Sequence, residues 1–170
     1  MNCKVEVLGF QHFYSNYSLV FKVFTRQKGY VLLRIDSGYD DQNKYIIFLD
    51  ANKLARILSP KDYFNFDNIH DFTENQEFWH TSKVDQCIQG FDNCQRSPIP
   101  LSDISFFDNE IRYTNGITRL NWLLSYGAEI IPAKTDVDSV RVLQDLFGAN
   151  TFEAKTLKTY FDEYSKLTYY

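Results

Sequence analysis

The chain has 170 residues, of which 44% are hydrophobic, and it carries a net charge of −4 at neutral pH. This length and hydrophobic content predict one domain, residues 1–170, built on one sizeable core. The 18 basic residues are spread along the sequence, which makes nucleic acid an unlikely partner, since proteins that bind the phosphate backbone usually concentrate their positive charge.

The cysteine, histidine and hydropathy patterns indicate whether to expect a metal site, a membrane span or a signal peptide. The three cysteines and three histidines show no spacing of a recognised metal site, so no metal is expected. No apolar run approaches the roughly twenty residues of a membrane span, and the first residues lack the pattern of a signal peptide. We therefore expect a cytoplasmic protein without membrane insertion.

Residues 1–58 are rich in strand signals. Apolar and β-branched segments at 5–8, 18–24, 30–35 and 45–49 are separated by turn residues at 28–29 and 37–41. This pattern predicts an antiparallel meander that extends or flanks a central sheet. Asp50 then stands before a segment with helical spacing, which predicts a short helix over 50–58 with an acidic N-cap.

The remaining chain alternates between helix and strand signals. Residues 59–79 are rich in Asn, Asp and Phe without a sustained period and predict a loop. We expect a short helix at 83–88, the start of a strand at 98–104, a strand at 111–113, a helix at 117–126 and a strand at 130–134. Helical spacing returns at 136–147, where Gly148 is a C-cap signal, and again in a C-terminal helix over about 151–168.

The most informative run is the turn Thr114-Asn115-Gly116 between the expected strand at 111–113 and the expected helix at 117–126. A helix N-terminus presents unpaired backbone N–H groups and the positive end of its dipole, and a glycine lets an anion come close to them. Arg119 stands in the first turn, where its guanidinium can reach the same anion. The run therefore predicts a phosphate site, although a plain strand-to-helix turn has the same local pattern.

Residues 82–148 as an ordered set resemble the ParB/sulfiredoxin superfamily. The shared features are the Lys83-Val84 helix, the Pro-Leu-x-x-Ile segment at 100–104, the glycine turn and the Ile-Pro segment at 131–132. Within that superfamily, the turn at 114–119 and the Trp-Leu-Leu helix at 122–124 are most similar to the plasmid fertility inhibition factors. The resemblance implies an α+β fold in which residues 79–148 form a mixed sheet flanked by helices.

The resemblance also implies which residues contact a nucleotide phosphate. Gly116 and Arg119 fall on the turn glycine and the phosphate-contacting arginine of the family motif. Lys83 falls on the lysine that sulfiredoxins use against ATP phosphates. Asn115 and Thr118 complete the expected set, and the implied ligand is ATP or another NTP with magnesium.

Two departures from the superfamily pattern weaken the expected catalysis, and no catalytic residue is assigned. Ile117 replaces the cysteine that performs sulfiredoxin chemistry, so reduction of a sulfinic acid is not expected. Thr118 stands where many relatives have histidine, and a threonine cannot serve as a general base near neutral pH.

Two functions remain open. The first is a cytosolic inhibitor, similar to plasmid fertility inhibition factors, that binds a protein of a DNA-transfer or secretion machine and blocks substrate transfer. The 12 Tyr and 15 Phe favour it if some are exposed, because aromatic side chains concentrate at interface centres. The second is a nucleotide-binding enzyme with weak NTPase or nuclease activity.

Overall fold

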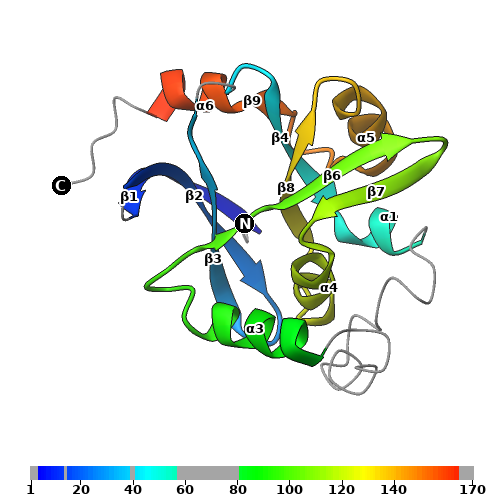
Figure 1. Ribbon diagram of the computed structural model, residues 1–170. Helices are drawn as coiled ribbons and strands as arrows, with labels where there is room; N and C mark the ends of the chain where they lie inside the picture. The colour runs from blue at the N-terminus through cyan, green and yellow to red at the C-terminus, as the bar shows by residue number, and fades with distance from the viewer. Residues whose placement is uncertain (1–3, 14, 39–40, 57–80, 165–170) are drawn as a thin grey trace.

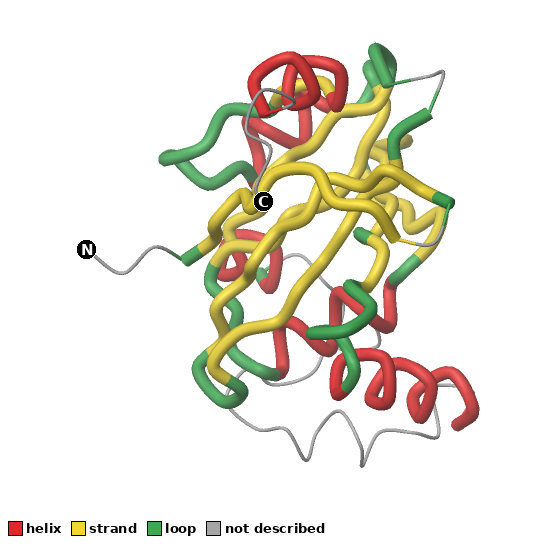
Figure 2. Tube along the Cα trace, turned by 90° about the vertical axis from the view of Figure 1, so that its left-hand side faces the viewer, coloured by secondary structure: helices red, strands yellow, loops and turns green. Residues whose placement is uncertain are grey.

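The computed structural model describes residues 4–13, 15–38, 41–56 and 81–164 (Figure 1). It has the expected mixed α+β architecture, with two sheets flanked by helices. Figure 2 shows the strands running through the middle of the molecule, with helices above and below them.

The first sheet has the order β1(Val5–Phe13), β2(Asn16–Thr25), β3(Gly29–Asp36) and β5(Ile99–Pro100). The first three strands are antiparallel and confirm the predicted N-terminal β extension, while β5 is parallel to β3. Residues 18–21 of β2 are all fully buried, so both faces of the strand are covered there, and burial alternates only beyond them, at Val23 and Thr25.

The second sheet has the order β7(Glu110–Asn115), β6(Ser102–Phe107), β8(Ile130–Asp136), β4(Lys44–Asp50) and β9(Lys155–Thr156). The strand predicted at 45–49 is present as β4. The prediction that it continues the antiparallel meander of the first three strands is wrong, because it lies in the second sheet. Its four consecutive residues 46–49 are all fully buried. Such a run indicates a central strand covered on both faces, and β4 lies between β8 and β9.

The single strand expected to start within 98–104 is two strands in different sheets. Ile99 and Pro100 pair with β3 in the first sheet, whereas Ser102 and Asp103 pair with β8 in the second. The intervening Leu101 donates its backbone N–H to the carbonyl of Arg34 at 2.8 Å. The chain thus crosses between the sheets within a few residues, which an apolar pattern alone cannot reveal.

The helices are α1(Ala51–Ala55), α3(Thr81–Asp92), α4(Ile117–Ser125), α5(Val140–Phe147) and α6(Leu157–Tyr164). Asp50 caps α1 as predicted, since its carboxylate accepts the N–H groups of Asn52 and Lys53 at 2.9 and 3.1 Å. The C-terminal helix starts later than expected because Thr156 caps it, accepting the N–H of Thr159 at 3.0 Å.

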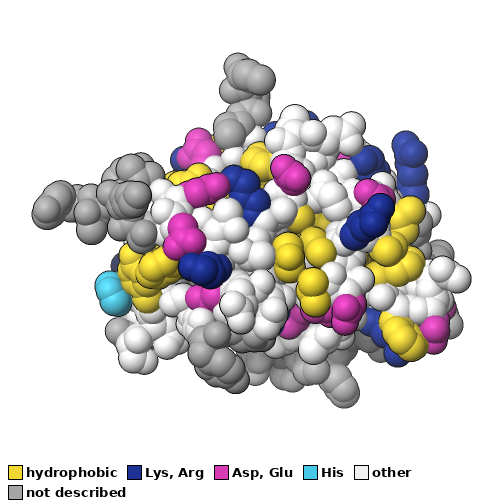
Figure 3. Space-filling view, turned by 90° about the horizontal axis from the view of Figure 1, so that it is seen from above, with side chains coloured by type: hydrophobic (Ala, Val, Ile, Leu, Met, Phe, Trp, Pro, Cys, Tyr) yellow, Lys and Arg dark blue, Asp and Glu magenta, His cyan; other side chains and the backbone are white. Residues whose placement is uncertain are grey.

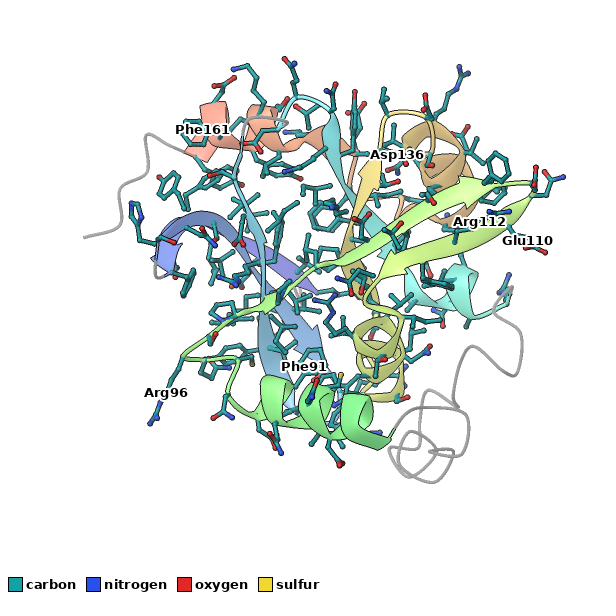
Figure 4. All side chains as sticks on the ribbon, viewed as in Figure 1. Phe91, Arg96, Glu110, Arg112, Asp136 and Phe161 are labelled. Atoms are coloured by element: carbon teal, nitrogen blue, oxygen red, sulfur yellow. The ribbon has the colours of Figure 1, made fainter. Side chains whose placement is uncertain are left out.

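Aromatic side chains join the helices to the sheets. Phe91 of α3 stacks on Trp122 of α4 with ring centroids 3.6 Å apart, and Trp122 stacks on Tyr126 at 3.7 Å. Phe21 of the first sheet meets Phe48 of the second edge to face at 6.0 Å. In Figure 4, Phe91 points from α3 toward the body of the protein, while Arg96 in the next turn points away from it.

Some predicted segments lie outside the described residues. These are the loop at 59–79 and the part of the expected C-terminal helix beyond residue 164. Across the ranges that the structure describes, no helix is both long enough and apolar enough to cross a membrane.

The Phe91–Trp122 stack predicts that truncating the Phe91 side chain strongly destabilises the protein. Phe91 is fully buried, so Phe91→Ala should lower the free energy of unfolding by about 3–5 kcal/mol through lost burial and a cavity. Gln89→Ala, on the exposed side of the same helix, is the matched control and should change it by less than about 0.5 kcal/mol. Urea unfolding measures both variants, and equal effects would show that the stack does not hold α3 in place.

Candidate functional site

The site is built around the crossing of the chain from β5 to β6. The turn that joins β7 to α4 lies beside this crossing, because Ser102 donates its hydroxyl to the carbonyl of Gly116 at 2.8 Å. Asn115, the last residue of β7, is paired with Asp103 of β6. The predicted glycine turn and the sheet-to-sheet crossing are therefore one unit of structure.

Gly116 is the N-cap of α4 and has a φ of +90°, in the left-handed region. A Cβ atom there would lie 2.6 Å from Nη2 of Arg119 and 2.9 Å from the Cα of Ser102. Both the backbone angle and the lack of space require glycine. The empty side of Gly116 is the surface on which the Arg119 guanidinium lies.

Arg119 joins the crossing to the turn. Its Nη1 donates to the carbonyl of Pro100 at 2.7 Å, and its Nη2 donates to Oδ1 of Asn115 at 3.1 Å. Burial lowers the pKa of Arg119, while interactions with Cys87 and Asp103 raise it. An arginine remains protonated at neutral pH, so the site holds a fixed positive charge whose two acceptors here are neutral oxygens.

A cleft of about 580 Å³ opens in front of this turn. This volume is within the range of about 300–1,000 Å³ typical of small-molecule sites. One wall comes from α3 and β5 and the other from the end of β7 and the first turn of α4. The lining residues are Gln86, Cys87, Gly90, Ile99, Tyr113, Thr114, Asn115, Gly116, Ile117, Thr118 and Arg119.

The first turn of α4 gives the cleft an electrostatic preference. The N–H groups of Ile117, Thr118 and Arg119 have no acceptor within the helix, and the helix dipole places its positive end at the same point. The structure describes all of α4, and the first turn of this helix contains no acidic residue. The arrangement therefore favours an anion over a cation.

Of the residues expected to hold a nucleotide, Asn115, Gly116, Thr118 and Arg119 line this one cleft. Lys83 lies in α3, one helical turn before Cys87, and its side chain is outside the described residues. Gln86, Cys87 and Gly90 of the α3 wall were not among the predicted site residues, and helical spacing from Lys83 is the sequence signal that indicates them.

Cys87 is the nucleophilic side chain of the α3 wall. Burial raises the pKa of its thiol to about 12, and the nearby Arg119 charge only partly opposes this. The thiol is therefore protonated at neutral pH, and reactivity requires the thiolate. Cys87 does not replace the nucleophile that is missing at Ile117.

Comparisons with known proteins identify a family and a fold. The sequence model described as "Plasmid Fertility inhibition factor" matches residues 46–148. A crystal structure of the oncogenic suppression activity protein, described as a plasmid fertility inhibition factor and solved as a gold(I) cyanide derivative, superposes with a TM-score of 0.70. That alignment covers 96% of this chain and 84% of the other at 15% identity, which shows a shared fold.

A search of curated proteins found no match. The descriptions of the matching family and structure do not mention the ParB/sulfiredoxin superfamily. The likeness to that superfamily therefore remains a prediction.

Alanine should destabilise the protein more at Gly116 than at Gly90, although both glycines line the same cleft. Gly116→Ala forces a side chain into the left-handed region and against Arg119, and it should lower the free energy of unfolding by about 1–3 kcal/mol. Gly90→Ala is the control, since a Cβ there meets only Ile99 at 3.5 Å and alanine favours a helix. Urea unfolding of both variants tests this, and a Gly116→Ala protein as stable as Gly90→Ala would contradict it.

Proposed function

The chain belongs to the plasmid fertility inhibition factor family, and we propose that it inhibits conjugative transfer by binding a protein of a DNA-transfer or secretion machine in the cytoplasm of the donor cell. The family match over residues 46–148, more than half of the chain, carries this proposal. A partner-binding inhibitor needs an exposed surface that a second protein can bury.

One such surface, here called the α5 face, consists of exposed apolar residues on and beside α5. Val142 and Leu146 stand four residues apart on the helix, Val137 lies in the preceding turn and Phe107 ends β6. The elements are adjacent, because α5 contacts β6 and Ser139 accepts the N–H of Phe106 at 3.0 Å. In Figure 3, which looks down on this end of the molecule, apolar side chains lie among charged ones.

The charges around the α5 face indicate the character of the partner. Asp136, Asp138 and Asp145 stand near its apolar residues; the cations are Arg141 of α5 and Arg112, which lies over the Phe107 ring at 4.5 Å. A complementary partner surface would be apolar at its centre and basic at its rim, since interfaces pair opposite potentials. The same acidic charge opposes pairing with a second copy of this chain.

The inner side of α5 anchors the helix independently of this face. Leu143 and Phe147 are buried in the core, whereas Val142 and Leu146 are exposed. Substitutions on the outer side should therefore change partner binding and leave the core intact.

A mating assay tests the inhibitor proposal. Donor cells that express the chain should transfer a conjugative plasmid at a lower frequency than donors with an empty vector. Leu146→Asp should restore transfer because it places a charge at the centre of the apolar face. Tyr30→Ser is the control, since Tyr30 is similarly exposed, 40% against 48% for Leu146, but lies on β3.

The outcomes of the mating assay are distinct. Equal transfer with and without the wild-type chain would contradict the inhibitor proposal. Inhibition that survives Leu146→Asp, with protein levels equal to wild type, would reject the α5 face as the contact surface.

A second proposed function is nucleotide binding in the cleft, with weak NTPase or nuclease activity at most. The converging N–H groups of α4, the close approach that Gly116 permits and the fixed charge of Arg119 support it. Asn115, Thr118 and Lys83 are further candidate contacts, and ATP or another NTP with magnesium is the proposed ligand. Thr118 cannot act as a general base, so we expect binding without rapid turnover.

A thermal shift measurement tests nucleotide binding. ATP, CTP or GTP with magnesium should raise the melting temperature of the wild-type protein, because a ligand of the native state stabilises it in proportion to saturation. Arg119→Ala should abolish the shift. Arg112→Ala is the control and should retain the shift, because Arg112 is an exposed arginine near the free end of the β7 hairpin in Figure 4. If none of the three nucleotides raises the melting temperature of the wild-type protein, the proposal is contradicted.

A further inference from the structure

A second hollow, of about 260 Å³, lies on the other side of Arg119 where the two sheets meet. It is smaller than the range of about 300–1,000 Å³ typical of a complete small-molecule site. Charged side chains from both sheets and from the first turn of α4 line it: Arg34, Asp36, Lys44, Asp103, Arg119 and Lys134. Four cations therefore face two carboxylates, on a chain whose net charge is −4.

The two carboxylates of the hollow do not neutralise all of its cations. Asp103 is bound to Lys134 at 2.5 Å. Asp36 accepts the Ser18 hydroxyl at 2.6 Å and lies 3.5 Å from Arg34, longer than a usual charge-assisted hydrogen bond.

Among the described side chains, neither Lys44 nor Arg119 has a carboxylate within hydrogen-bond distance, although Asp103 interacts electrostatically with Arg119. Lys44 is 3.9 Å from the carboxylate of Asp41, and the acceptors of Arg119 described above are the neutral oxygens of Pro100 and Asn115. At the edge of a protein, where the effective dielectric is below that of water, these two charges attract an anion.

The hollow is continuous with the cleft through shared residues. Asn115 and Arg119 line both spaces. An anionic group seated on the amides of α4 is therefore next to the Arg119 side chain, and the hollow begins on its other side. A ligand that spans both needs further anionic groups bonded directly to the first one.

We propose that the hollow is an anion subsite for the terminal phosphoryl groups of a nucleoside di- or triphosphate whose nucleoside lies in the cleft. This assignment rests on the proposed nucleotide-binding function and extends it to the place of the terminal phosphates. Lys44 contributes from β4, outside the glycine turn, whereas Lys134 of β8 is paired with Asp103. The subsite therefore favours nucleotides with two or three phosphates over nucleotides with one.

Isothermal titration calorimetry at fixed ionic strength, with AMP, ATP and inorganic tripolyphosphate as probes, tests the subsite. The wild-type protein should bind ATP at least about tenfold more tightly than AMP, since a hydrogen bond to a charged group contributes about that factor. Lys44→Gln should reduce ATP and tripolyphosphate affinity by about tenfold and leave AMP affinity unchanged. Lys22→Gln is the control, since the two lysine side chains are similarly exposed, 26% and 28%.

A second variant should strengthen binding. Asp103→Asn removes the carboxylate that holds Lys134 and should raise the affinity for tripolyphosphate, a gain that misfolding cannot produce.

The subsite proposal and the nucleotide-binding proposal fail on different results. Equal affinities for AMP and ATP, or equal losses in Lys44→Gln and Lys22→Gln, would overturn the subsite while nucleotide binding stands. Tripolyphosphate binding that depends on Lys44, without binding of any nucleotide, would leave an anion site in the hollow but overturn both the nucleotide function and the subsite for its terminal phosphates.

Discussion

The hydrogen bond from Arg119 to the carbonyl of Pro100 lies at the point where the chain crosses from one sheet to the other, and this crossing positions both cavities. Residues 99–103 belong to both sheets, so the chain must turn from one ladder to the other within a few residues. Arg119 satisfies the carbonyl at this crossing, and its guanidinium fits there because Gly116 has no side chain.

The same constraint explains why two cavities share one arginine. The crossing separates the cleft at the start of α4 from the charged hollow between the sheets, and Arg119 lines both. The α5 face consists of other residues, on and beside α5. Partner binding and nucleotide binding are therefore proposed for different surfaces, so substitutions can separate the two functions.

Local signals in the sequence were sufficient for most elements and for one half of the site. The cap at Asp50, the first three strands and the turn at Gly116 depend on residues close together in the chain. The place of β4 was not predictable in this way, since its partner β8 is distant in sequence and the buried run at 46–49 is compatible with more than one position in a sheet. The α3 wall with Cys87 and the residues around Lys44 come together only through tertiary structure.

We propose that the N-terminus of α4, beside Gly116 and Arg119, receives an anion. The most direct measurement is the change in backbone amide chemical shifts of ¹⁵N-labelled protein during titration with ATP. The largest changes are expected at Ile117, Thr118 and Arg119, with smaller ones in the turn of α3 that lines the same cleft. Saturable changes elsewhere, with these three amides unmoved, would contradict it.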